Sequence, residues 1–180
     1  MVGKKNIVFG LIYFVATASL GLVMSNNLAD VGEARSDMAG KMSTLEQNVQ
    51  SGFMMADNPS IVTGEALLGL NNYLKTENQK INAIKGGPHA HGNLESMANI
   101  VIGLLLMFLA VPVAFKQVIS WLFLIAAVFH SGMLYLGVIF GQGWAMTVLG
   151  TGIGPIALLA GLLLAGIAAI MGLKAQPQEE

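Results

Sequence analysis

The chain contains no cysteine and few charged residues, and both shortages restrict what it can be. Without cysteine it has no disulfides, no thiolate nucleophile, no cysteine-held iron–sulfur cluster and no covalently attached haem. Only 11% of its 180 residues are charged, whereas a typical soluble domain has about 25%. The net charge is −1, and no basic patch is present, which argues against a nucleic-acid partner.

Several catalytic signatures are also missing. The sequence has no glycine-rich phosphate loop, no H-E-x-x-H and no G-x-S-x-G. Apart from Glu95, the predicted membrane spans contain no acidic residue, which argues against an ion-coupled transporter. The sequence therefore does not predict an enzyme that works on its own.

Apolar residues, which form 54% of the chain, are concentrated in four long runs. The runs cover residues 6–24, 96–115, 118–140 and 146–173, and each is long enough to cross a bilayer. The first run continues past a stretch that resembles a signal-peptide cleavage site, Ala16-Thr17-Ala18, so we predict an uncleaved anchor. The predicted fold class is all-α, a four-transmembrane-helix bundle.

The positions of the lysines predict the orientation in the membrane. Lys116 and Gln117 separate the second and third runs and predict a turn there. With four spans, one side of the membrane carries the lysines that lie near the span ends: Lys4, Lys5, Lys116 and Lys174. The positive-inside rule makes this side cytoplasmic. We expect a multi-pass protein of the bacterial inner (cytoplasmic) membrane, with both termini in the cytoplasm.

The segment between the first two spans is predicted to be an extracytoplasmic helical hairpin. Its two halves carry apolar seams with heptad-like spacing, separated by the turn-forming sequence Asp57-Asn58-Pro59-Ser60. The first seam is Leu28, Val31, Arg35, Met38, Met42, Leu45, Val49 and Gly52, and the second is Leu67, Leu70, Leu74, Ile81 and Ile84. The seams face each other or a partner. The predicted domains are an anchor at 1–25, the hairpin at 26–90 and a three-helix membrane region at 91–180.

The last run is rich in glycine and alanine, which allow close approach of helices in lipid. These small residues serve either packing within the chain or a contact between copies in a homo-oligomer.

Two of the three histidines, His89 and His91, lie at the mouth of the second span, and the third, His130, lies near the middle of the third span. Ionisable residues inside a membrane are expensive and are therefore functional candidates. Histidine is the commonest metal ligand in proteins, including for copper and haem iron. Asn93 and Glu95 follow the pair closely and are candidate orienting partners of these ligands.

The stretch His89-Ala90-His91-Gly92-Asn93-Leu94 resembles the H-A-H-x-N-L pattern of small membrane proteins related to subunit I of haem-copper oxidases, especially of the cbb3 kind. In those oxidases a histidine at the start of the second helix ligates low-spin haem b, so the resemblance implies a haem ligand here. The relatives usually continue with Gly-Trp, where this chain has Glu95-Ser96. Because a full oxidase subunit needs about six histidine ligands, three histidines imply an accessory role.

A turn at 116–117 would place His130 level with Gly103, about 18 Å from His91 at 1.5 Å per residue. These two histidines are then poor axial partners for one haem. The haem would be shared between subunits, completed by another residue such as methionine, or absent.

A second interpretation is copper held by His89 and His91, which could converge on one ion if the segment after Pro88 is extended or forms a turn; on a helix the two side chains would diverge by about 200°. Thioethers suit copper, and six methionines lie on the predicted extracytoplasmic side: Met24, Met38, Met42, Met54, Met55 and Met97.

Each site residue also has a purely structural interpretation. His89 and His91 can cap the start of the span, and His130 can hydrogen-bond across helices, with Ser131 and Tyr135 as nearby partners. Glu95 can be a solvated charge favoured by the helix dipole.

Two functional hypotheses follow. The leading one is an integral membrane accessory subunit of respiratory or metal-dependent redox chemistry, which binds haem b or copper through His91 and His89, with His130 as a further ligand. The alternative is a structural or interaction protein, whose hairpin docks a partner or a second copy. The expected partners are the lipid bilayer and either other membrane subunits or further copies of this chain.

Overall fold

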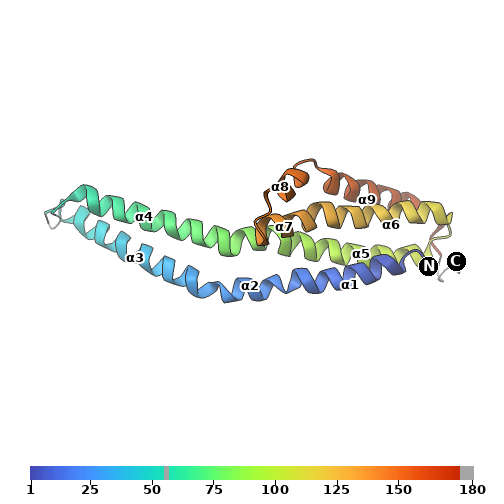
Figure 1. Ribbon diagram of the computed structural model, residues 1–180, viewed down its shortest axis with the longest axis horizontal. Coiled ribbons are helices and arrows are strands. Elements are labelled where there is room, and N and C mark those ends of the chain that lie inside the picture. The colour runs from blue at the N-terminus through green and yellow to red at the C-terminus, as the bar shows by residue number, and fades with distance from the viewer. Residues whose placement is uncertain (55–56, 175–180) are drawn as a thin grey trace. The chain divides into compact units, whose positions relative to one another are not determined.

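The computed structural model describes residues 1–54 and 57–174, and these fold almost entirely as helices (Figure 1). The helices are α1 (Lys4–Ala18), α2 (Leu20–Asn26), α3 (Leu28–Gln50), α4 (Pro59–Glu77), α5 (Ala90–Phe108), α6 (Val113–Ala127), α7 (Met133–Ile139), α8 (Gly143–Leu149) and α9 (Ile153–Gly172). Three π-helical segments lie between them: η1 (Asn78–Asn82), η2 (Lys85–His89) and η3 (Val128–Gly132). The described residues form no β-strand, only an isolated bridge between Leu109 and Leu173. The prediction of an all-α protein is confirmed.

The chain divides into two compact units. One comprises Met1–Leu20 and Lys85–Glu180, and the other comprises Gly21–Ile84. We call them the bundle unit and the α3–α4 unit. The histidines and the apolar runs after residue 90 belong to the bundle unit.

Three helical stretches are long and apolar enough to cross a membrane: Lys4–Gln50, whose apolar part lies near the N-terminus, Val113–Ile139 and Ile153–Gly172. These helices suit a lipid bilayer. The run predicted at 146–173 is interrupted, because Gly152 has a left-handed backbone (φ 73°) and separates α8 from α9. Helix α5 is not among the three, since its first half is rich in polar residues. A fourth span there remains a prediction.

The turn between α5 and α6 lies earlier than the lysine position predicted. Helix α5 ends at Phe108, and Pro112 caps α6 in an extended conformation (φ −53°, ψ 139°). Proline disfavours a helical conformation in the residue before it, so the chain turns at residues 109–112. Lys116 lies in the first turn of α6 and is buried. The predicted turn at Lys116–Gln117 is therefore wrong.

Glycines set the spacing of the helices in the bundle unit. A Cβ on Gly103 of α5 would lie 2.7 Å from the carbonyl oxygen of Gly3, just before α1, so the two backbones touch. On α9, a Cβ on Gly154 would lie 2.6 Å from the backbone nitrogen of His130, and one on Gly161 would lie 3.0 Å from the ring of Phe123. The small residues of α9 thus serve packing within the chain at these positions.

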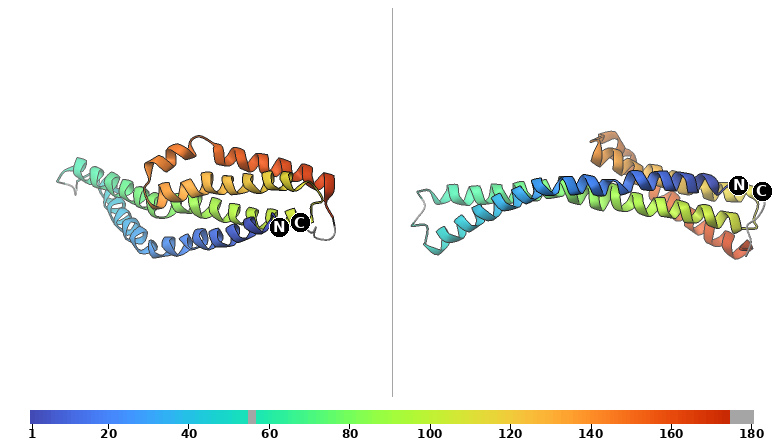
Figure 2. Two further views of the ribbon diagram at one scale, coloured as in Figure 1. Left: turned by 45° about the vertical axis from the view of Figure 1, so that its right-hand side comes forward. Right: turned by 90° about the horizontal axis from the view of Figure 1, so that it is seen from below.

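In the α3–α4 unit, the two helices are packed side by side (Figures 1 and 2). A Cβ on Gly69 would lie 2.9 Å from Lys41 and 3.4 Å from the Cα of Met38, and Lys80 forms an ion pair with Asp30. The helices are therefore antiparallel. The side chains buried between them are small, with Ala34 7% and Ala66 0% exposed.

Only part of each predicted seam takes part in this contact. Val31, Met38 and Leu45 are partly buried. Other seam members are exposed, by between 41% and 60%: Leu28, Met42, Val49, Leu67 and Leu74. Because the helices meet through glycine and alanine, the larger apolar side chains stay outside the contact.

Candidate metal centre

Glu95 is buried inside the bundle unit, with 2% of its surface exposed. It lies on α5, and its carboxylate oxygens accept three hydrogen bonds from η3. His130 Nδ1 lies 2.5 Å from Oε1, while the backbone nitrogen and hydroxyl of Ser131 lie 3.3 Å and 2.5 Å from Oε2. The interpretation of Glu95 as a solvated charge is wrong, since it is a buried and fully hydrogen-bonded acceptor.

The π-helical segment η3 explains how two consecutive residues reach one carboxylate. Its wider turn interrupts the regular helix between α6 and α7, and such segments are frequent at functional sites. The Tyr13 hydroxyl lies 3.0 Å from Ser131 Oγ. Since Ser131 donates its proton to Glu95, Tyr13 donates to Ser131. Helices α1 and α5 and segment η3 thus meet at one carboxylate.

His91 lies next to His130. The ring centroids are 4.7 Å apart, with an interplanar angle of 61°. The predicted separation of about 18 Å is wrong, because the turn at residues 109–112 brings the start of α5 level with η3. His130 bonds Glu95 rather than Ser131 or Tyr135.

His89 lies apart from this pair. Its backbone is already helical (φ −69°, ψ −53°), so its side chain diverges from that of His91. Its Nδ1 lies 2.9 Å from the carbonyl oxygen of Thr17, and because a carbonyl only accepts, Nδ1 donates. The Thr17 hydroxyl in turn donates to Asn93 Oδ1 at 2.8 Å. The structure therefore joins His89 and Asn93 to α1, and brings His91 and His130 together.

The Glu95 hydrogen bond selects one tautomer of a neutral His130. In that tautomer Nδ1–H donates to the carboxylate, and Nε2 carries the lone pair that can bind a metal. Histidines that bind metals almost always donate their other ring N–H to a carboxylate, a carbonyl or water, which holds the ring and raises its basicity. Glu95 thus orients His130, whereas the sequence offered it as a partner of the His89–His91 pair.

The distance between the two rings indicates which group they can share. Two imidazoles on opposite faces of a haem iron have centroids roughly 6 Å apart, since each metal–nitrogen bond is about 2 Å. Two imidazoles that bind one ion at a right or tetrahedral angle have centroids roughly 4.5 to 5 Å apart. The observed 4.7 Å lies within this second range and is also the separation of an edge-to-face ring contact. A haem held between His91 and His130 of one chain does not fit.

The pair supplies two ligands. Within the described residues, no group of three or more His, Cys, Asp or Glu side chains is placed to hold a metal ion. Of the six methionines noted above, Met97 belongs to the bundle unit and is 48% exposed, and Met55 lies outside the described residues.

A second polar cluster, which the sequence analysis missed, lies further along the same helices. The Asn6 amide donates to Asn99 Oδ1 at 2.9 Å and to the Ser120 carbonyl at 3.0 Å, and all three residues are buried. Asn99 donates to the Glu95 carbonyl at 2.9 Å. The spacing of the polar residues could have predicted this cluster. Asn6 and Tyr13 share one face of α1, and Glu95 and Asn99 share one face of α5.

Comparison of the chain with protein-family models, curated proteins and solved structures gives no match.

Proposed function

We propose that the chain is an integral membrane accessory subunit of respiratory or metal-dependent redox chemistry, and that His91 and His130 bind one copper ion. The observation that carries this proposal is the buried hydrogen bond from His130 to Glu95 beside the ring of His91. Copper is favoured over haem b by the ring separation, and imidazole is a suitable ligand for it. When bound, copper supplies one-electron chemistry.

The residues around the pair have defined roles. Glu95 holds His130 in one tautomer, and Ser131 and Tyr13 hold Glu95. The His130 side chain is 18% exposed. A ligand-bearing ring fixed by a buried network is pre-organised, which improves the affinity for a metal.

The arrangement of charges supports the orientation in a bacterial inner membrane. Lys5 Nζ lies 2.7 Å from Gln117 Oε1, and the backbone nitrogen of Lys174 donates to the Phe108 carbonyl at 2.9 Å. The start of α1, the start of α6 and the end of α9 therefore lie at one end of the bundle unit. By the positive-inside rule this end is cytoplasmic, and the histidines and residues 26–90 belong to the extracytoplasmic side.

Elemental analysis and absorption spectra of the purified protein test the proposal. We expect one copper per chain after loading in mild detergent and removal of free metal, and no reduced haem b band with dithionite. A haem b band at stoichiometric intensity would instead support haem shared between copies. A colourless protein that binds no copper under any loading condition would contradict the proposal.

Glu95→Gln is expected to weaken copper binding by about 10- to 100-fold, the usual cost of losing an orienting partner. The amide has nearly the same size, but it offers one acceptor oxygen where the carboxylate offers two. The dissociation constant, from chelator competition, checks this. Asn93→Ala is the control, because Asn93 bonds Thr17 outside the pair. An unchanged constant in Glu95→Gln would show that Glu95 does not orient a ligand.

A further inference from the structure

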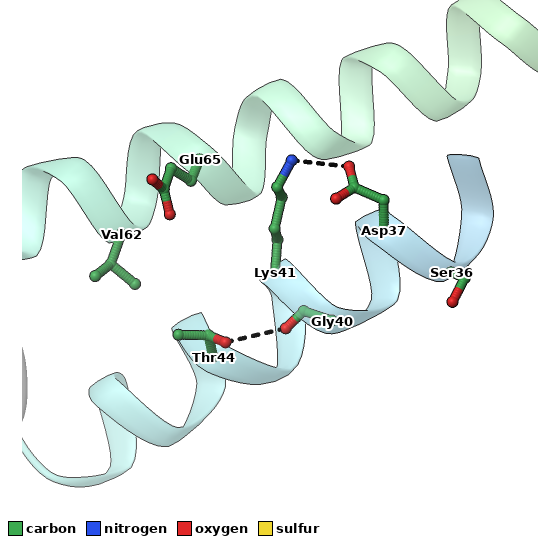
Figure 3. Close-up of a pocket in the computed structure, with 7 residues that line it drawn as sticks. All are labelled: Ser36, Asp37, Gly40, Lys41, Thr44, Val62 and Glu65. Atoms are coloured by element: carbon green, nitrogen blue, oxygen red, sulfur yellow. Dashed lines mark hydrogen bonds and ion pairs between the residues drawn. The ribbon is translucent and has the colours of Figure 1, made fainter. Parts of the chain in front are cut away.

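The two sides of the α3–α4 unit differ in polarity. Figure 3 shows one side, where Asp37, Lys41 and Thr44 of α3 lie beside Val62 and Glu65 of α4 around a hollow of about 290 Å³. Further along the same side, Asp30 and Glu33 lie with Asn72, Thr76 and Lys80. This side is suited to water.

The opposite side carries an apolar stripe. We define the stripe by its helical positions as Leu28, Arg35, Met42 and Val49 on α3, Leu67, Leu70, Leu74 and Glu77 on α4, and Ile81 on η1. Leu70, Glu77 and Ile81 are partly buried, and the other members are exposed. The α3 members are seven residues apart, as are Leu67, Leu74 and Ile81. In an antiparallel pair, these positions flank the contact on one side. Ile61 and Leu68 are also exposed, but they lie outside this stripe.

An exposed apolar stripe on a water-facing unit marks a surface that binds another molecule. Two charged residues, Arg35 and Glu77, lie within the stripe itself, and charged side chains in contact with lipid hydrocarbon are costly, so lipid is not the covering medium. Heptad spacing on both helices is the pattern of a coiled-coil contact with further helices. The covering surface is therefore helical.

The charges within the stripe indicate which helices cover it. Arg35 and Glu77 are its two charged members. The contact of Gly69 with Met38 and Lys41 sets the antiparallel register and places these two charges within about one helical turn of each other along the pair. In a pair of stripes, Arg35 of each copy can therefore face Glu77 of the other copy.

We propose that the stripe binds the same stripe of a second copy of this chain, which makes a four-helix bundle with two-fold symmetry. A two-fold axis parallel to the α3–α4 pair places α3 of one copy beside α4 of the other at equal height. Arg35 then faces Glu77 of the second copy. Contact between the two α3 helices would instead oppose Arg35 to itself. The proposal is independent of the metal site.

The mass of the full-length protein in detergent, from light scattering, tests the proposal. We expect a dimer that Leu67→Glu/Leu74→Glu dissociates, because both side chains are exposed and their replacement leaves the fold intact. The matched control is Asn72→Glu/Gln79→Glu, with the same spacing on the polar side, which keeps the dimer. Helical circular dichroism checks that both variants fold. Copper content stays unchanged in both.

Disulfide cross-linking tests the pairing of the helices. Because the chain contains no cysteine, only the introduced cysteines can form the disulfide. Since Gly69 packs on Met38 and Lys41, Met42 is level with Leu67. We expect a disulfide dimer when a Met42→Cys chain is co-expressed with a Leu67→Cys chain, and little from either variant alone. A monomeric wild-type protein, a dimer that survives the stripe substitutions without the mixed cross-link, or strong cross-linking of Met42→Cys alone would overturn the proposal.

Discussion

His91→Ala and His130→Ala are each expected to lose the bound copper, whereas His89→Ala retains it. The first two remove a ligand outright, so the fall in affinity exceeds the roughly 10- to 100-fold that a lost orienting partner costs. His89 bonds the Thr17 carbonyl and lies away from the pair. The copper-to-protein ratio after loading and gel filtration measures the effect.

His89→Ala is a matched control because it removes the same ring two residues from His91. Circular dichroism and thermal melting in detergent show whether each variant still folds, which matters for His130→Ala because it leaves Glu95 without one of its donors. Equal copper in all three variants would contradict the assignment of the ligands. Loss in His89→Ala alone would restore the pairing of His89 with His91.

Gly103→Leu is expected to separate α1 from α5 and to lower the free energy of unfolding by about 3 kcal/mol or more, the upper part of the range for overpacking. A Cβ at this position would lie 2.7 Å from the Gly3 carbonyl and 3.0 Å from the Ile7 nitrogen. Both are backbone atoms, so no side-chain rotation relieves the clash. Thermal melting of the purified protein and its yield from the membrane measure the loss.

Gly166→Leu is the control for this prediction. It places the same side chain on α9, where nothing lies within 4 Å of a Cβ, and it should melt close to the wild-type temperature. Because α1 brings Asn6, Tyr13 and Thr17 to the polar clusters, Gly103→Leu should also lose copper. A Gly103→Leu protein as stable as Gly166→Leu would show that the close approach of the helices is not required.

The all-helical fold class of this chain could be predicted from hydropathy. The register between neighbouring helices, which decides which residues lie side by side, could not. The charge of Lys116 was taken to mark a turn, yet this lysine is buried in α6. Pro112 gave the better signal, since its ring cannot continue a helix from the residues before it. Moving the turn by six residues changes the partner of His130 from Gly103 to His91.

The environment of Glu95 could not be derived from sequence position either. A carboxylate near a span boundary suggests solvent, but burial depends on which face of α5 turns inward. The spacing of Glu95, Asn99, Ile102 and Leu106 places them on one helical face, and all four are buried. The polar residues of this face find partners on α1, α6 and η3, and these partners emerge only in the folded bundle.

The seams of the α3–α4 unit show the same limit. Heptad spacing identified the apolar positions, but the phase of the contact was set by small residues. Ala34, Ala66 and Gly69 allow the backbones to approach and therefore occupy the contact, so Met42 and Leu67 stay outside. Spacing alone cannot choose between two stripes that are offset by one position.

Electron paramagnetic resonance of the copper-loaded, oxidised protein tests most directly whether His91 and His130 share one ion. With ¹⁵N-labelled histidine, we expect hyperfine coupling to two imidazole nitrogens in the wild type and in His89→Ala. His91→Ala and His130→Ala should each lose coupling to one nitrogen, or lose the signal with the metal. Coupling to two imidazoles that persists in His130→Ala, or copper that shows no histidine coupling, would contradict the shared site.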